Sequence, residues 1–466
     1  MKWKRLGQIF SPQNYSLPLD CHDFAQSPQA LVLTDRIRIY FSTRCIDKSN
    51  GKFLSHVAYV DMDKKLKTIL GTSSNPVIPL GDLGCFDEHG IFPFSPFQDG
   101  NKITAYTCGW SRRKSVSVET ATGYAESFDN GQTFIKLGTG QIFGATLTQP
   151  FLVGDSFVRK YNNQYHMWYM FGQKWIQQNK ESAPDRVYKI GHAASNDGLN
   201  WTPEPHAIIS DVLHENECQA LPSVIYHGGL YHMFFCYRDV FGFRTDKTKG
   251  YRLGYAYSFD LINWTRDDQS GGMGLLTDAM AWDSDMLCYP HIFECDDHIY
   301  LLYNGNDFGR NGFGAAVLQS NYHYKINTSD AQNIKSHFLS CDKNFLNDLS
   351  SRINLDDYIQ KLVEKSVRYE AWENDRLVGL LAVYRQNPQS QDSDFITNMT
   401  VSETHAGQKV ASHLLSYCIS QTQNTEIRLE VGKDNHRAMN LYKKFGFKQS
   451  GEGLKSFHLT LIIGQK

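Results

Sequence analysis

Carboxylates recur at one position of a pattern that repeats through the first two thirds of the 466-residue chain. The acidic residues at this position are Asp23, Glu88, Glu217 and Asp285; Asp87 precedes Glu88, and the third repeat has Phe151 there with Asp155 four residues later. Like charges gathered at one place push their pKa values apart and can supply an acid and a base. The pattern predicts proton transfer to a bound substrate, although an acid before a strand also serves to satisfy turn amides.

A second set of polar and aromatic residues follows the next strand of each repeat. With Asp155, the residues that we expect to bind substrate are Arg44, Trp110, Lys174 or Trp175, Arg238, and Asn304 with Asn306. Hydroxyl groups donate and accept hydrogen bonds, and the apolar face of a sugar stacks on an indole ring. The two sets together predict a site for a polyhydroxylated ligand.

The elements that must position these residues are five similar hairpins. Each has an apolar strand, a two-residue turn rich in Asp, Gly or Asn, and a second strand with alternating aromatics. The equivalent positions lie 63 to 68 residues apart, at Pro28, Pro93, Ser156, Pro222 and Pro290, and a third strand ends near Ser127, Ser195 and Ser258. With three or four strands per unit and no helical periodicity, residues 1–325 are predicted to form an all-β five-bladed β-propeller. Whether residues 1–10 close the ring is left open.

Stretches of this region also resemble known enzymes. AQSPQALVLTDRIRIYFSTR, FDEHGIFP and WDSDMLCYPHIF followed by YNGN are similar to the five-bladed propellers of glycoside hydrolase families 43 and 32. The resemblance implies that Asp23 is the catalytic base, that Glu217 is the general acid, and that Asp87 or Glu88 orients the base. Asp285 has no role in that scheme. Retention or inversion depends on the separation of the carboxyl groups, which the sequence does not give.

The aromatic hairpins of the repeat stop at about residue 325, and residues 326–466 are predicted to form a separate α+β domain. An amphipathic helix is expected in the later half of 336–366, with strands at 367–374, 376–386, 394–403 and 426–432 and helices at 407–421 and 435–446. The last helix matches the pattern N-x-x-A-x-x-L-Y-x-x-x-G-F at Asn435, Ala438, Leu441, Tyr442, Gly446 and Phe447. Gly446 is placed to end that helix.

The order of elements and this motif resemble the GNAT superfamily of acetyltransferases. The resemblance implies acetyl-CoA as cofactor and Tyr442 as the general acid for the departing thiolate. The cofactor-binding residues that it implies are Met399, Val401, Gly407, Gln408, Lys409, Val410, Ala411, Ser412, Asn435 and Ala438. The phosphate-binding loop departs from the family pattern, because Ala406 and Lys409 replace its first residue and its middle glycine. Glu403, His405 and Glu430 are alternatives for the base.

Composition narrows the remaining possibilities. Hydrophobic residues make up 41% of the chain, charged residues make up 21%, and the formal charge of -2 argues against a nucleic-acid partner. The basic opening residues lack the apolar run of a signal peptide, and no stretch is apolar enough to insert in a membrane, so a cytoplasmic location is expected. The ten cysteines contain no CxxC pair and are expected to be free thiols. No metal site is predicted, although acidic side chains at a propeller mouth would suit a hard cation.

Three functions are consistent with this sequence. The first is an N-acetyltransferase that acts on an amino sugar or sugar nucleotide in bacterial surface-glycan biosynthesis, with a sugar-binding or hydrolase-like propeller. The second is a glycoside hydrolase with an accessory or degenerate GNAT domain. The third is a noncatalytic glycan-binding or scaffolding propeller. The substrate in the first case is inferred from the fusion of the two domains, which is an association only.

Overall fold

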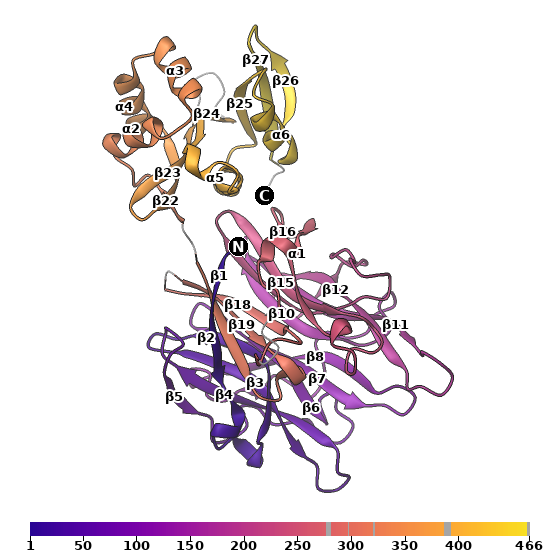
Figure 1. Ribbon diagram of the computed structural model, residues 1–466. Coiled ribbons are helices and arrows are strands. Elements are labelled where there is room, and N and C mark those ends of the chain that lie inside the picture. The colour runs from indigo at the N-terminus through magenta and orange to yellow at the C-terminus, as the bar shows by residue number, and fades with distance from the viewer. Residues whose placement is uncertain (276–280, 297, 320–321, 386–392, 464–466) are drawn as a thin grey trace. The chain divides into compact units, whose positions relative to one another are not determined.

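The computed structural model describes residues 1–275, 281–296, 298–319, 322–385 and 393–463 (Figure 1). The chain forms two compact units. The first comprises Met1–Ile225 and Tyr231–Gln319, and the second comprises Ser320–Lys466 with Tyr226–Leu230. This division falls six residues before the predicted boundary at residue 325, so that β21 (His323–Ile326) belongs to the sheet of the second unit.

The first unit is built almost entirely of strands in antiparallel groups of four. Three groups are separate sheets. One consists of β10 (Val153–Tyr161), β11 (Gln164–Ile176), β12 (Asp185–Ser195) and β13 (Thr202–Pro203), and the next consists of β14 (Cys218–His227), β15 (Leu230–Arg238), β16 (Arg252–Ser258) and β17 (Trp264–Arg266). The third consists of β18 (Cys288–Cys295), β19 (His298–Asn304), β20 (Phe313–Leu318) and β1 (Trp3–Phe10). In the last sheet β1 pairs with β20, which brings residues 3–10 beside residues 313–318 (Figure 1).

The remaining eight strands of the first unit form one sheet with two antiparallel groups. These are β2 (Asp23–Val32), β3 (Ile37–Ile46), β4 (Phe53–Met62) and β5 (Ile69–Thr72), and then β6 (Gly90–Asp99), β7 (Lys102–Arg112), β8 (Val118–Ser127) and β9 (Ile135–Lys136). A single parallel pair, Ser55 with Gly90, joins the two groups. The helical elements of this unit are short: Pro12–Asn14, Pro18–Asp20, Lys247–Lys249, α1 (Asp268–Gly271) and Asn306–Gly309.

The repeated sequence motif corresponds to repeated hydrogen bonds at the end of the third strand. A serine hydroxyl there lies within hydrogen-bond distance of an aspartate two residues later and accepts a main-chain N–H of the turn. The hydroxyl-to-carboxylate distances are 2.8, 3.0 and 3.1 Å for Ser127 with Asp129, Ser195 with Asp197, and Ser258 with Asp260. The turn that closes each of these strands is therefore stabilised in the same way.

The first strand of each group shares a second feature. The residue directly before the equivalent position has a left-handed backbone at Ser27 (φ 53°), Asp155 (φ 53°), Leu221 (φ 51°) and Tyr289 (φ 57°), and in the second group the Phe92–Pro93 peptide is cis. Strand pairing shifts register at this place in β2, β6, β10 and β18. A β-bulge redirects a side chain, and a non-glycine residue at positive φ is uncommon enough to mark the position as specialised.

The second unit is an α+β domain with one seven-stranded sheet. The strand order is β21, β22 (Val367–Glu373), β23 (Arg376–Tyr384), β24 (Ser393–Val401), β25 (Glu426–Gly432), β27 (Ser456–Ile462) and β26 (Lys448–Glu452). The pair β24 and β25 is parallel and extends over only four residues of each strand, Ser393–Ile396 with Glu426–Leu429, whereas the other pairs are antiparallel.

Helices cover both faces of this sheet. On one side α2 (Ala331–Leu339) and α4 (Leu355–Lys365) bury Phe338 and Leu362 against Leu380 of β23, and α3 (Lys343–Arg352) lies beside them. On the other side α5 (Val410–Gln421) and α6 (His436–Lys444) bury Leu414 and Tyr442 with alternate residues of the same strands. Among the described residues, no helix is long and apolar enough to cross a membrane.

Candidate functional sites

The first unit contains a cavity of about 750 Å³ to which all five strand groups contribute. Its aromatic lining consists of Phe24, Phe53, Phe92, Trp110, Tyr188, Phe243, Tyr251, Tyr289 and Phe308. Its charged lining consists of five arginines and two aspartates, namely Arg44, Arg186, Arg238, Arg244, Arg310, Asp155 and Asp307. A cavity of this size with aromatic walls and a few charged groups has the properties of a small-molecule site.

Four of the seven predicted substrate-binding residues line this cavity: Arg44, Trp110, Asp155 and Arg238. Lys174 does not, and its nearest carboxylate is Glu215 at 3.9 Å. Asn304 is buried and links β19 to β2, because it accepts the Ser27 N–H at 2.8 Å and donates to the Ala25 carbonyl at 2.8 Å. Asn306 similarly accepts the main-chain N–H of Asp285 at 2.8 Å.

None of the five predicted catalytic carboxylates of the first unit lines the cavity. Asp23 lies at its edge, where it accepts from Arg310 at 3.0 Å. The side chain of Asp87 is buried, with Oδ2 2.5 Å from Lys136 Nζ, and the Glu88 carboxylate accepts the main-chain N–H of Gly84 at 3.1 Å. Asp285 pairs with Lys247 at 2.6 Å, and this contact holds the pKa of Asp285 below its usual value. Each of these four carboxylates therefore has a partner, but only Glu88 accepts an amide of its own turn, and the other three pair with cations distant in the sequence.

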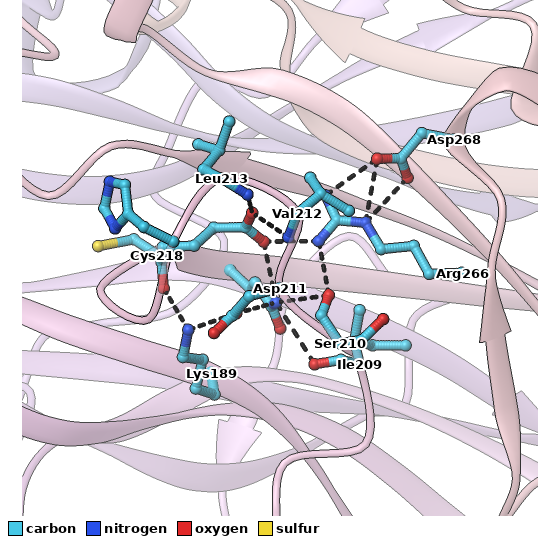
Figure 2. Close-up of polar contacts among 12 residues, drawn as sticks. Lys189, Ile209, Ser210, Asp211, Val212, Leu213, Cys218, Arg266 and Asp268 are labelled. Carbon is cyan, nitrogen blue, oxygen red and sulfur yellow. Dashed lines mark hydrogen bonds and ion pairs between the residues drawn. The ribbon is translucent and has the colours of Figure 1, made fainter.

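Glu217, the predicted general acid, is completely buried in an ion pair. Its carboxylate accepts from Arg266 at 2.6 Å and from the main-chain N–H groups of Val212 and Leu213 at 3.0 and 2.9 Å. Arg266 also contacts Asp268 (Figure 2). Burial acts to raise the pKa of Glu217, but the Val212 amide and Arg266 outweigh it, and the pKa is lowered. A carboxylate held in its charged form by these donors is poorly suited to donate a proton, and its geometry is that of a structural anchor for the 210–217 loop.

Asp155 is the buried carboxylate of the cavity. It lies at the bulge of β10, and loss of solvent raises its pKa to about 7 against the opposing effects of Arg186, the Leu221 amide and Cys108. Such a carboxyl group exchanges its proton near neutral pH, which is the property required of a general acid or base. Another position of the sequence repeat indicates this site. The lining residues Phe92, Asp155, Leu221 and Tyr289 stand directly before the equivalent positions, not five residues before them.

The arginines of the cavity were largely missed from the sequence, since Arg186, Arg244 and Arg310 lie outside the repeated strand ends. Arg238 is buried, donates to the carbonyl oxygens of Asp239 and Val240, and lies 3.5 Å from the centre of the Phe243 ring. Arg244 lies 4.2 Å from the same ring centre. Arginine stacks on aromatic rings in this way without losing its charge.

The predicted acid of the second unit, Tyr442, lies on α6. Asn435 caps this helix by accepting the Ala438 N–H at 3.1 Å, and Gly446 ends it with a φ of 87°. Tyr442 is buried beside Phe447, with ring centres 5.5 Å apart, and loss of solvent raises its pKa well above the usual value. The motif therefore forms the capped helix that its sequence indicates, with a tyrosine that keeps its proton.

The loop before α5 contains the other predicted cofactor contacts. Gly407 has φ 87° and Lys409 has φ 63°, and α5 begins at Val410 without a side-chain cap on its first N–H groups. Val410, Ala411 and Ser412 form the first turn of the helix, and the main-chain amides of such a turn suit the phosphate groups of acetyl-CoA. The side chain of Gln408 has a hydrogen-bond partner within the domain, because its Oε1 accepts from the Tyr322 hydroxyl at 2.7 Å. Met399, Val401 and Ala438 lie partly buried along the same hydrophobic core.

Of the alternatives for the base, His405 has the most defined surroundings. It is buried with Nε2 3.0 Å from Glu373 and Nδ1 2.6 Å from the Ser402 hydroxyl. Glu403 is exposed, and Glu430 accepts from Ser456. A carboxylate that fixes the orientation of an imidazole is a common arrangement for proton transfer.

Comparison with known proteins decides the nature of the second unit. Residues 332–447 match the acetyltransferase (GNAT) family. The second unit is a GNAT acetyltransferase domain. This confirms the resemblance seen in the sequence of α6. The match reaches Phe447, the last residue of that motif.

The first unit has the fold of glycoside hydrolases. Similar solved structures include a glycoside hydrolase with a TM-score of 0.52 and a BT0996 RGII complex with a TM-score of 0.50. Each is 15% identical, and each alignment covers 68% of this chain and 93% of the other. The uncharacterized protein MT1551 of Mycobacterium tuberculosis (strain CDC 1551 / Oshkosh) is 29% identical over 326 residues, which are 69% of this chain and all of that protein. At these identities the structural likeness concerns the fold and not the reaction.

Proposed function

We propose that this protein is an acetyl-CoA-dependent N-acetyltransferase that modifies an amino sugar or sugar nucleotide in bacterial surface-glycan biosynthesis. The observation that carries the transferase activity is α6, in which a capped helix of the GNAT domain places Tyr442 in the core with its proton retained. The 750 Å³ cavity of the first unit supports a carbohydrate as substrate. A protein that uses acetyl-CoA for biosynthesis is expected in the cytoplasm.

We infer that the five strand groups of the first unit are the blades of a β-propeller. The four strands of each group, sequential except where β1 completes the last group, support five equivalent units, as do the repeated serine–aspartate turn and the repeated bulge. The pairing of β1 with β20 is the contact by which the ring would close. The bulged first strands then surround the cavity, which explains why every group contributes to its lining.

In the second unit, acetyl-CoA supplies an acetyl group activated as a thioester. The chain would hold its phosphates with the amides of Val410–Ser412, while Lys409 adds a positive charge to the same loop. The hydroxyl of Tyr442 is protonated at neutral pH, as in any tyrosine, and is our proposal for the group that donates a proton to the departing thiolate. His405, oriented by Glu373, is our proposal for the base that removes the proton of the acceptor amine.

Calorimetry with acetyl-CoA tests this function first. We expect the full-length protein to bind acetyl-CoA and to transfer its acetyl group to at least one member of a set of amino sugars and amino-sugar nucleotides. Release of free coenzyme A thiol measures the transfer. An absence of acetyl-CoA binding would remove the transferase activity from consideration, whereas binding with transfer only to peptides would retain the transferase and exclude the sugar.

A second candidate function rests on Asp155. A proton-exchanging carboxyl group in an aromatic cavity favours cleavage or synthesis of a glycosidic bond in the first unit. Asp307 is the other carboxylate of the lining, and Asp23 lies at the edge of the cavity, where it forms an ion pair with Arg310. Glycoside cleavage that is lost in Asp155→Asn but retained in Glu217→Gln would support this function. Binding without cleavage would leave the first unit as a glycan-binding module.

A further inference from the structure

The charged groups of the cavity are unequal in sign. Arg44, Arg186, Arg238, Arg244 and Arg310 face a space that contains two aspartates. Among the described residues only Arg310 has a carboxylate within 4 Å, namely Asp23 outside the lining. Four guanidinium groups therefore line one cavity without an ion-pair partner from the described part of the chain. Of these four, Arg238 is buried, Arg44 and Arg186 are partly buried, and Arg244 is exposed. Removing a charge from water is costly unless an opposite charge compensates it.

Arg44 shows this most clearly. It lies 4.6 Å from the ring centre of Phe24, and its buried Nε has no hydrogen-bond partner among the described residues. Loss of solvent lowers its pKa, and the positive charge of Arg244 contributes to this lowering. Two arginines that repel one another in a cavity, neither of them paired with a described acid, form a site to which an anion would be strongly attracted.

A continuous cluster extends from this pair. Phe243 has Arg238 at 3.5 Å and Arg244 at 4.2 Å from its ring centre, so that the ring holds two guanidinium groups in place. Arg238 uses Nε and Nη1 for Tyr188 and for two carbonyl oxygens, which fixes its orientation. Neutral hydroxyl groups alone do not require such a concentration of positive charge, whereas a phosphate or carboxylate group does.

We propose that the cavity binds an anionic saccharide, one that carries a phosphate or carboxylate group, with that group held by Arg44, Arg238 and Arg244. The sugar ring lies against the aromatic lining that includes Trp110 and Tyr289, within reach of Asp155. This inference rests on the proposal that the cavity binds a carbohydrate, and it names the chemical class of that carbohydrate. A sugar phosphate, a sugar nucleotide and a uronic acid share the required chemistry.

Matched probes test this proposal by calorimetry on the full-length protein. The probes are glucose, galactose and mannose, each as the neutral sugar, the 6-phosphate and the uronate, together with UDP-glucose and inorganic phosphate. We expect at least one anionic form to bind about tenfold or more tightly than its neutral parent, and this preference to decrease with added salt. The form that binds best distinguishes a phosphate from a carboxylate.

Variants assign the preference to the cavity. Arg44→Met and Arg244→Met should each weaken binding of the anionic form by about tenfold or more, and Arg44→Lys should retain part of it. Arg36→Met, an arginine outside the lining, should leave binding unchanged. Because Arg244 is exposed, its substitution tests the proposal even where Arg44→Met fails to fold.

Several results would overturn the proposal. Equal affinity for neutral and anionic forms would remove the preference for an anion but leave carbohydrate binding intact. Binding of inorganic phosphate as tightly as any sugar phosphate would mean that the site holds a free anion. Unchanged affinity in both arginine variants, or no binding of any anionic probe at millimolar concentration, would also refute it. Acetyl-CoA binding by the second unit is measured separately, so that its failure is distinguishable from these outcomes.

Discussion

Glu217 and Arg266 form an ion pair in the first unit with 2.6 Å between Oε1 and Nη1, and both side chains are almost completely buried. The pair connects the loop at 210–217 to β17, because Arg266 also donates to the Ser210 carbonyl at 2.7 Å. A residue that resembles a general acid by its position in a repeat is therefore part of the structural framework.

Glu217→Gln should destabilise the protein by about 1–3 kcal/mol, because the buried Arg266 then keeps only Asp268 as an ion-pair partner. Chemical denaturation measures the loss. The double variant Glu217→Gln with Arg266→Met should recover part of it, since the buried Arg266 charge is then removed and the Asp268 left behind is partly exposed. A Glu217→Gln protein of normal stability that loses a glycoside-cleaving activity would contradict this assignment and return Glu217 to a catalytic role.

Asp155 should give the first unit a measurable dependence of stability on pH. Its pKa is about 7 in the folded protein and near 3.8 when unfolded, so the folded state holds a proton that the unfolded state has lost. Stability should therefore fall as the pH rises from about 4 to about 7, by an amount on the order of a few kcal/mol. Denaturation of the wild type and of Asp155→Asn across this range isolates the effect, because the asparagine variant lacks the slope. Parallel curves for the two proteins would contradict the prediction.

Tyr442→Phe should lower the rate of acetyl transfer by about 10²-fold or more, the lower end of the range for a general acid. The ring and its contact with Phe447 remain, so the melting temperature should change little. Tyr384→Phe, a tyrosine of β23 in the same unit, serves as the control and should transfer at the wild-type rate. A Tyr442→Phe enzyme with full activity would show that another group or water protonates the thiolate.

Lys409→Gly should stabilise the protein by up to about 1 kcal/mol, because Lys409 has a left-handed backbone that only glycine adopts without cost. The same change removes the positive charge that we propose for phosphate binding, so it should weaken acetyl-CoA binding. Thermal unfolding and calorimetry measure the two effects. Lys409→Ala keeps the unfavourable backbone, so it should lose affinity without gaining stability. An unchanged or tighter affinity in Lys409→Gly would contradict a role of the lysine charge in phosphate binding.

Parts of the fold could be predicted from the sequence where a pattern reports a local interaction. The α6 motif is of this kind, since Asn435 caps its own helix and Gly446 ends it. The serine–aspartate turns at Ser127, Ser195 and Ser258 are another case, because both partners lie two residues apart. Such features need no knowledge of tertiary structure.

Features that depend on distant contacts were not predictable in the same way. Glu217 and Arg266 are 49 residues apart, and no periodicity connects them. Arg244 and Arg310 line the cavity from irregular segments that the repeat does not describe. The bulges were not predicted either, and in four of the five groups the residue directly before the equivalent position, Phe92, Asp155, Leu221 or Tyr289, lines the cavity.

The pairing of β1 with β20 also constrains how the first unit is made in the cell. Residues 3–10 leave the ribosome before their partners at 313–318, which follow about 300 residues later. At roughly 5–20 residues per second, β1 stays without its neighbour for about 15–60 s of translation. In the folded unit the ring of Phe10 packs against Phe41 and Phe313, and its contact with Phe313 cannot form during that time. The sheet of β18, β19, β20 and β1 therefore cannot be completed until residues 313–318 have been synthesised.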